Sequence, residues 1–182
     1  MTMIDDYINP QDNALVQRAA RLAEYAHRDQ RRDWTGAPYF RHVEEVATVL
    51  WMVGQPAVVV AAGYLHDTLE DTALDPTVIA LETSEDVLRY VREVTNPADK
   101  DKFPESTRAE RRAMNTSHLF NASWQGKTLK LADILANCRD VRRHSRFGTA
   151  YIEEKLEYLR LVPGGHSKLR QYVYSFILGE PV

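Results

Sequence analysis

The apolar run from Val58 to Leu65 leads directly into four ionisable residues, His66, Asp67, Glu70 and Asp71, in the segment YLHDTLEDT. Ionisable side chains next to a buried run are costly to bury unless they are paired or bind a metal ion. On one continuous helix, His66 and Glu70 would lie four residues apart, as would Asp67 and Asp71, giving two neighbouring polar ridges. Because the adjacent imidazole and carboxylate can both reach one cation, the segment predicts the centre of a metal-dependent hydrolase.

Helical periodicity runs through the whole chain. Apolar residues follow helical spacing over 15–26, after Asp12 or Asn13, either of which can cap the helix start. The same spacing continues over 43–53, where Gly54 is placed to end the helix. No Asn-Gly hairpin signal and no internal repeat interrupt the pattern, which predicts an all-α fold.

Pro56 suits the first turn of the next helix, although the apolar run that follows it could also be a buried strand. We favour a helix because the segment continues without Gly-Pro punctuation into the His-Asp pair. Ser84 is a candidate cap, and Thr107 with Glu110 matches a capping box. Further helices are expected over 84–95, 107–120, 125–143, 149–162 and 166–178, with loops over 33–38 and 96–104.

Length and composition indicate one globular domain over residues 1–182. The net charge of −3 gives no overall attraction to nucleic acid or membranes, and no apolar stretch approaches the roughly 20 residues of a membrane span. No signal peptide is apparent at the N-terminus. The single cysteine, Cys138, excludes an intrachain disulfide and suits a reducing cytosol, so we expect a cytoplasmic protein.

A histidine and an aspartate elsewhere in the chain are candidate ligands for the same cation. His42 lies early in a helix among inward-facing apolar residues, where a histidine more often only finds a hydrogen-bond partner. Asp133 is flanked by apolar residues and therefore needs a charge partner, which could instead be Lys130 or Arg139. Together with His66 and Asp67 they would supply mixed nitrogen and oxygen ligands, which favour Mn²⁺, Fe²⁺ or Zn²⁺.

Three segments, YFRHVEEVA, YLHDTLEDT and LKLADILANCRD, together resemble the HD-domain hydrolases of the RelA/SpoT homologue family, in particular the small alarmone hydrolases. The likeness extends from about residue 13 to residue 160 in unbroken order. It implies an all-helical HD fold, one Mn²⁺ per chain and removal of the 3′-pyrophosphate from guanosine 3′,5′-bis(diphosphate) or its pentaphosphate relative. The implied site comprises the metal ligands His42, His66, Asp67 and Asp133 and the water-handling acids Glu70 and Asp71.

Such a substrate is strongly anionic, and basic residues gather in three clusters despite the negative net charge. They are His27, Arg28, Arg31 and Arg32; Arg108, Arg111 and Arg112; and Arg139, Arg142, Arg143 and Arg146. A single arginine of this kind more commonly belongs to a solvated surface. By position, Arg32 matches a family residue that packs on the purine, and Arg28 lies in the same cluster. Arg108 and Arg112 share a helix face and could clamp a diphosphate.

The resemblance also implies that Asn137 contacts the ribose and that Tyr151 approaches the nucleotide. The chain departs from the family pattern at Asp33, directly after Arg32, and at Ile134, directly after the metal aspartate. These departures leave the identity of the purine base undecided, so an adenosine alarmone is an alternative substrate. Two competing hypotheses are that the chain is another HD phosphohydrolase or a non-catalytic nucleotide sensor on the same scaffold. We expect a nucleotide as partner, without nucleic acid or membrane, and leave the oligomeric state open.

Overall fold

The computed structural model describes residues 10–33, 35–144 and 148–180, and within these ranges the chain forms ten helices and no strand. The first five helices are α1 (Pro10–Ala26), α2 (Phe40–Met52), α3 (Ala57–Leu65), α4 (Thr68–Asp71) and α5 (Pro76–Glu82). The other five are α6 (Glu85–Val94), α7 (Arg108–Phe120), α8 (Trp124–His144), α9 (Gly148–Leu161) and α10 (Ser167–Leu178). The expected all-α fold is therefore confirmed.

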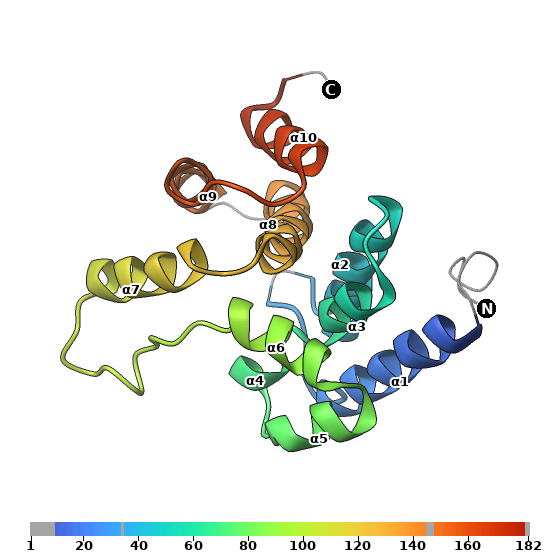
Figure 1. Cartoon of the computed structure of the whole chain (residues 1–182). Coiled ribbons are helices and arrows are strands. Elements are labelled where there is room, and N and C mark those ends of the chain that lie inside the picture. The colour runs from blue at the N-terminus through green and yellow to red at the C-terminus, as the bar shows by residue number, and fades with distance from the viewer. Residues whose placement is uncertain (1–9, 34, 145–147, 181–182) are drawn as a thin grey trace.

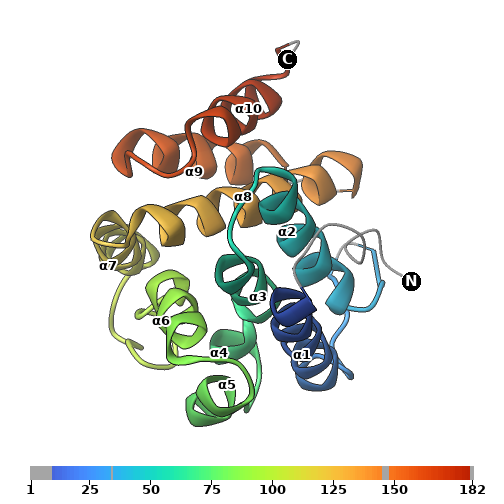
Figure 2. The same cartoon turned by 45° about the vertical axis from the view of Figure 1, so that its right-hand side comes forward.

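Helix α8 runs through the middle of the molecule and organises the other helices around it (Figures 1 and 2). Helices α9 and α10 lie on one side of α8, and helices α1 to α6 lie on the other side. Helix α8 contacts α2, α3 and α6 on one side and α9 and α10 on the other. The central position of α8 is consistent with its run of buried residues from Leu131 to Ala136, which includes the charged Asp133.

Helices α2 and α3 approach each other closely at a glycine. A Cβ atom added at Gly63 would lie 2.6 Å from Cδ1 of Leu50 and 3.2 Å from the Cα atom of Ala47. Both neighbours are completely buried and have little room to move, so a larger residue at Gly63 would overpack the core. This close approach brings the histidine of α2 next to the histidine that follows α3.

The segment after α3 differs from the expected continuous helix. Helix α3 ends at Leu65, His66 and Asp67 form a turn, and the short helix α4 begins at Thr68. The helical reading of the apolar run is confirmed, but the reading of one helix through Asp71 is wrong. The turn lets His66 and Asp67 face the interior together while α4 carries the two following acids to the surface.

The expected helix starts are partly confirmed. The hydroxyl of Ser84 caps α6, and Thr107 and Glu110 form the expected capping box of α7. The expected cap at Asp12 or Asn13 is wrong, because both residues lie inside α1, which begins at Pro10. Helix α5 was not expected, although its capping Asp75, followed directly by proline, is a typical helix start.

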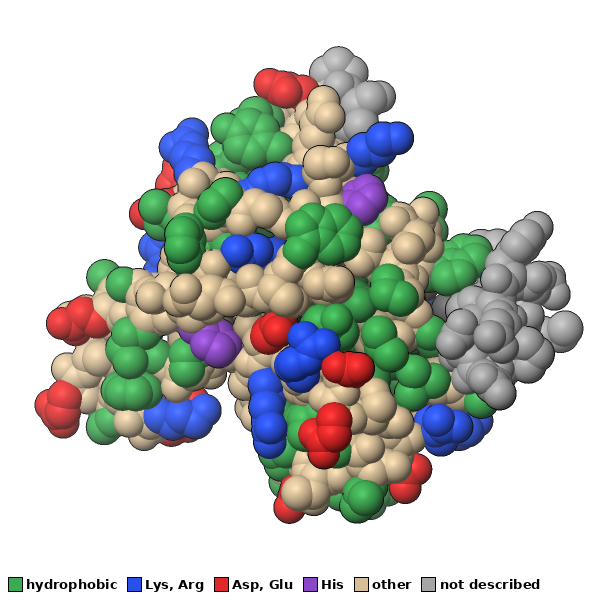
Figure 3. Space-filling model, in the orientation of Figure 1, with side chains coloured by type: hydrophobic (Ala, Val, Ile, Leu, Met, Phe, Trp, Pro, Cys, Tyr) green, Lys and Arg blue, Asp and Glu red, His purple; other side chains and the backbone are tan. Residues whose placement is uncertain are grey.

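On the face shown in Figure 3, charged side chains of both signs are interspersed, and no face-wide patch of one sign is present. Within the described residues, no helix is both long and apolar enough to span a membrane. The C-terminal aromatic residues Tyr172, Tyr174 and Phe176 are partly buried and pack against the core. Each of these three side chains therefore contributes partly to packing within the chain.

Candidate metal centre and active site

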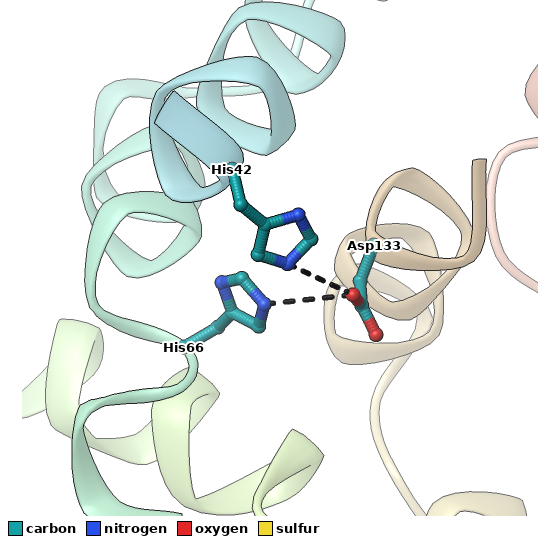
Figure 4. A group of neighbouring side chains, drawn as sticks. All are labelled: His42, His66 and Asp133. Carbon is teal, nitrogen blue, oxygen red and sulfur yellow. Dashed lines mark ion pairs between the residues drawn. The ribbon is translucent and has the colours of Figure 1, made fainter. Parts of the chain in front are cut away.

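Two histidines and an aspartate from three separate helical segments converge in the interior. His42 projects from α2, His66 follows α3 and Asp133 lies on α8, and all three point toward a common centre (Figure 4). Their ligand atoms lie within 4.8 Å of one another. The Oδ1 atom of Asp133 is 3.3 Å from Nε2 of His42 and 3.6 Å from Nε2 of His66.

The carboxylate of Asp67 completes this group. Its Oδ2 atom lies 3.0 Å from Nε2 of His66 and 3.4 Å from Nε2 of His42. The four residues expected from the sequence to bind the metal therefore meet at one point. They surround it with two imidazole nitrogens and two carboxylates.

The donor atoms suit a divalent cation. The buried Nε2 atoms of His42 and His66 have no hydrogen bond of acceptable geometry to the described residues. Nδ1 of His66 lies 2.8 Å from the carbonyl oxygen of Gly63, which can only accept, so in the neutral imidazole Nδ1 carries the proton and Nε2 offers its lone pair inward. Two inward-facing imidazoles beside two carboxylates match the mixed nitrogen and oxygen sets of first-row divalent metals.

The electrostatics of the centre favour a positive charge at this point. Burial disfavours the charged form of each imidazole, but the neighbouring carboxylates outweigh burial and raise the pKa of His66 to about 10. In turn, although burial opposes it, the two histidines keep the pKa of Asp67 well below its ordinary value. Because metal binding requires neutral imidazoles, a cation bound here would displace these protons.

Three further side chains hold the carboxylates in place. The hydroxyl of Tyr39 donates a hydrogen bond of 2.6 Å to Oδ2 of Asp67. Lys130 pairs with Oδ2 of Asp133 at 2.9 Å, and Asn137 donates to Oδ1 of the same carboxylate. The alternative partner for Asp133, Arg139, instead pairs with a glutamate on α2. This supporting role of Tyr39 was not predicted from the sequence, although its position three residues before the histidine of α2 could have indicated it.

Glu70 and Asp71 lie on α4, one turn beyond the metal centre. Both oxygens of Glu70 accept hydrogen bonds from Asn96, at 2.8 Å from its backbone N–H and 2.9 Å from its side chain. Glu70 is exposed at the surface, but its carboxylate is partly desolvated by the surrounding protein, which raises its pKa. The positive charge of Lys130 opposes this effect and does not cancel it. Asp71 accepts a hydrogen bond of 3.3 Å from Gln30. Glu70 and Asp71 are exposed, whereas His66, just before α4, is buried.

Arg32 and Asn137 are linked to the metal centre through a chain of hydrogen bonds. Arg32 is buried and pairs with Asp140 at 2.8 Å, and it also donates to Oδ1 of Asn137 at 2.9 Å. Its guanidinium lies 5.4 Å from the ring centroid of Tyr39. The sequence did not reveal the partnership with Asp140, and packing of Arg32 on a purine stays a prediction.

The remaining candidate substrate-binding residues are engaged within the chain. Arg108 pairs with Glu154 at 2.9 Å and Arg112 pairs with Glu157, so both arginines connect α7 to α9. Arg28 is exposed, donates a hydrogen bond of 3.0 Å to the backbone carbonyl of Tyr25 and pairs with Asp29 at 3.3 Å. Tyr151 is partly buried, with the Lys155 ammonium 4.7 Å from its ring centroid. The side chains of Arg142 and Arg143, and all of Arg146, lie outside the described residues.

Comparisons with known proteins agree with this geometry. A family model described as an HD domain matches residues 19–157. Curated relatives include the guanosine-3′,5′-bis(diphosphate) 3′-pyrophosphohydrolase MESH1 of Xenopus tropicalis, which is 37% identical over 72% of this chain and 72% of its own length. The human MESH1 is 36% identical over 71% of each chain.

A solved structure described as a metazoan orthologue of SpoT that hydrolyses ppGpp is also similar. It superimposes with a TM-score of 0.79 and 27% sequence identity, covering 91% of this chain and 94% of its own. The likeness thus includes nearly the whole helical arrangement around the metal centre.

Proposed function

The chain belongs to the HD-domain family. We propose that it removes pyrophosphate from the 3′ position of guanosine 3′,5′-bis(diphosphate), giving GDP. The observation that carries this proposal is the convergence of two buried imidazoles and two carboxylates at one point, followed directly in the chain by α4, which carries Glu70 and Asp71. The activity named for the curated relatives, which match most of this chain, supports the same substrate.

We assign the metal ligands to His42, His66, Asp67 and Asp133, and we propose Mn²⁺ as the ion. A divalent cation at this point would lower the pKa of a bound water and polarise a phosphoryl oxygen. The inward-facing Nε2 atoms supply neutral donors, and the two carboxylates balance the charge of the ion. These four residues would hold the ion, which would supply an activated water and a binding position for a substrate oxygen.

The side chains around this centre have separate tasks in the proposed reaction. Glu70 and Asp71 orient the attacking water and accept its proton as it attacks phosphorus. Asn96 holds both oxygens of Glu70 and so fixes the direction of that carboxylate. Arg32 and Asn137, joined by a hydrogen bond, position the nucleoside next to the metal centre. Tyr151 approaches the nucleotide from α9.

The partner in this proposal is a small nucleotide in the cytoplasm. Phosphate-product analysis of the purified chain with guanosine 3′,5′-bis(diphosphate) and Mn²⁺ tests the proposal. We expect GDP and pyrophosphate in equal amounts, and no turnover after the metal is removed with a chelator. The matching adenosine compound, assayed in parallel, measures the purine preference. Release of orthophosphate, or binding without any turnover, would contradict the proposal and favour another phosphohydrolase or a nucleotide sensor.

Replacing Tyr39 with phenylalanine is expected to weaken metal binding. The change removes the hydroxyl that donates at 2.6 Å to Asp67 and leaves the ring in place. Loss of such a supporting hydrogen bond typically lowers metal affinity by about 10- to 100-fold. Calorimetric titration with Mn²⁺ measures the effect, and Tyr174→Phe on α10 is the matched control. Equal affinities of the Tyr39→Phe variant and the wild type would show that the hydroxyl does not support the metal centre.

A further inference from the structure

Residues 96–98, which follow α6, are hydrogen-bonded to two different parts of the molecule. At one end, Asn96 donates to both oxygens of Glu70, from its backbone N–H at 2.8 Å and from its side chain at 2.9 Å. At the other end, Ala98 is buried and exchanges two hydrogen bonds with the side chain of Asn115 on α7. This short segment therefore links α7 to the carboxylate that accepts the proton in the proposed reaction.

The contact between Asn115 and Ala98 fixes both the position and the orientation of the backbone. Oδ1 of Asn115 accepts from the N–H of Ala98 at 2.9 Å, and Nδ2 of Asn115 donates to the carbonyl oxygen of Ala98 at 2.9 Å. A side-chain amide presents a donor and an acceptor in one plane, so Asn115 can satisfy both polar groups of the same residue. Two such bonds leave the backbone little freedom to rotate at Ala98.

Pro97 lies between the two attachment points and stiffens the connection. Its ring fixes its own φ near about −65° and disfavours helical backbone at the preceding Asn96. Few free dihedral angles therefore separate Asn96 from Ala98. Because of this stiffness, a shift of Ala98 would also shift Asn96.

Helix α7 is itself attached to the helices on both sides of it. Arg108 and Arg112 pair with glutamates on α9, and the ring of His118 lies 3.1 Å from the backbone carbonyl oxygen of Arg92 on α6. Asn115 lies on α7 between these attachments. It therefore gives residues 96–98 a fixed point of support.

We propose that Asn115 is a positioning residue for the proposed hydrolysis, and that it orients the carboxylate of Glu70 through the backbone of Ala98 and the two hydrogen bonds of Asn96. The inference rests on the proposed function, in which Glu70 takes a proton from the attacking water. A general base must lie within hydrogen-bond reach of the proton that it removes, so its orientation affects the rate.

Replacing Asn115 with alanine tests this role, because alanine favours the helix and removes both hydrogen bonds to Ala98. Since small displacements of a catalytic group strongly reduce the rate, we expect kcat to fall by about 10- to 100-fold, with little change in KM or Mn²⁺ affinity. Asn121→Ala is the matched control, because it removes a hydrogen bond to the carbonyl oxygen of Ser117 at the end of the same helix. The control should keep the wild-type kcat, and a wild-type kcat for Asn115→Ala would overturn the proposal.

A double-mutant cycle with Glu70→Gln separates orientation of Glu70 from a general effect on the fold. Once the base is absent, its orientation no longer affects the rate. Adding Asn115→Ala to Glu70→Gln should therefore cause little further loss of kcat. An equal fractional loss with and without the carboxylate of Glu70 would show that Asn115 acts independently of it, and the proposal would be wrong.

Amide hydrogen exchange separates failure of this inference from failure of the proposed function, because it does not depend on turnover. The N–H of Asn96 is bonded to Glu70, so it should exchange faster in Asn115→Ala than in the wild type, and at the wild-type rate in Asn121→Ala. A wild type without hydrolytic activity would remove the proposed function, yet faster exchange at Asn96 in Asn115→Ala would still support the positioning of Glu70. Equal exchange at Asn96 in Asn115→Ala and the wild type would overturn it.

Discussion

Replacing His66 with alanine is expected to abolish both metal binding and hydrolysis. The change removes one of two inward-facing imidazole donors and leaves the carboxylates of Asp67 and Asp133 with one imidazole, that of His42, beside them. A bound metal ion contributes several kcal/mol to stabilising charge in the transition state, so its loss corresponds to a rate reduction of about 10³-fold or more. Metal content after dialysis and initial rates of pyrophosphate release measure the two effects.

The control for this change is His118→Ala on α7, which removes an imidazole that contacts the backbone carbonyl of Arg92, away from the metal centre. This variant should keep both metal and activity. Circular dichroism of the two variants checks that each keeps its helices. Wild-type turnover by folded His66→Ala protein would show that the metal assignment is wrong.

Much of the fold follows from apolar spacing and local capping, but the break after α3 does not. The backbone at His66 (φ −59°, ψ −33°) remains helical, and at Asp67 (φ −95°, ψ −5°) it departs only moderately. No glycine or proline marks the turn, so local propensity continues the helix through it. Helix α5, by contrast, could have been predicted, because its capping aspartate and the following proline are a local helix-start signal in the sequence.

The metal ligands could be predicted from the sequence by residue type, but the contacts that support them could not. Histidine and aspartate among apolar neighbours signal a buried cluster because their isolated burial is costly. The sequence does not show that Asn96, 26 residues from Glu70, holds its carboxylate. It also does not show that glutamates on α9 pair with Arg108 and Arg112, because such pairs depend on how α7 packs against α9.

Replacing Glu70 with glutamine is expected to reduce kcat by about 10²–10⁴-fold while metal binding remains intact, since loss of a general base typically has this effect. Glu70 lies outside the group of inward-facing metal donors, and its two oxygens are held by Asn96. The amide of glutamine fills the same volume but cannot accept a proton. Asp71→Asn should cause a loss in the same range. Single-turnover rates and Mn²⁺ titrations measure the two quantities separately.

The pH dependence gives an independent readout of the same role. Burial raises the pKa of Glu70, so its carboxylate becomes protonated and unable to act as a base as the pH falls through that raised value. The wild-type rate should therefore decline toward acidic pH, and Glu70→Gln should lose the part of this decline that belongs to Glu70. Glu153→Gln, an exposed substitution on α9, is the matched control and should keep the wild-type profile. A Glu70→Gln variant with wild-type kcat and an unchanged pH profile would assign proton transfer to Asp71 alone.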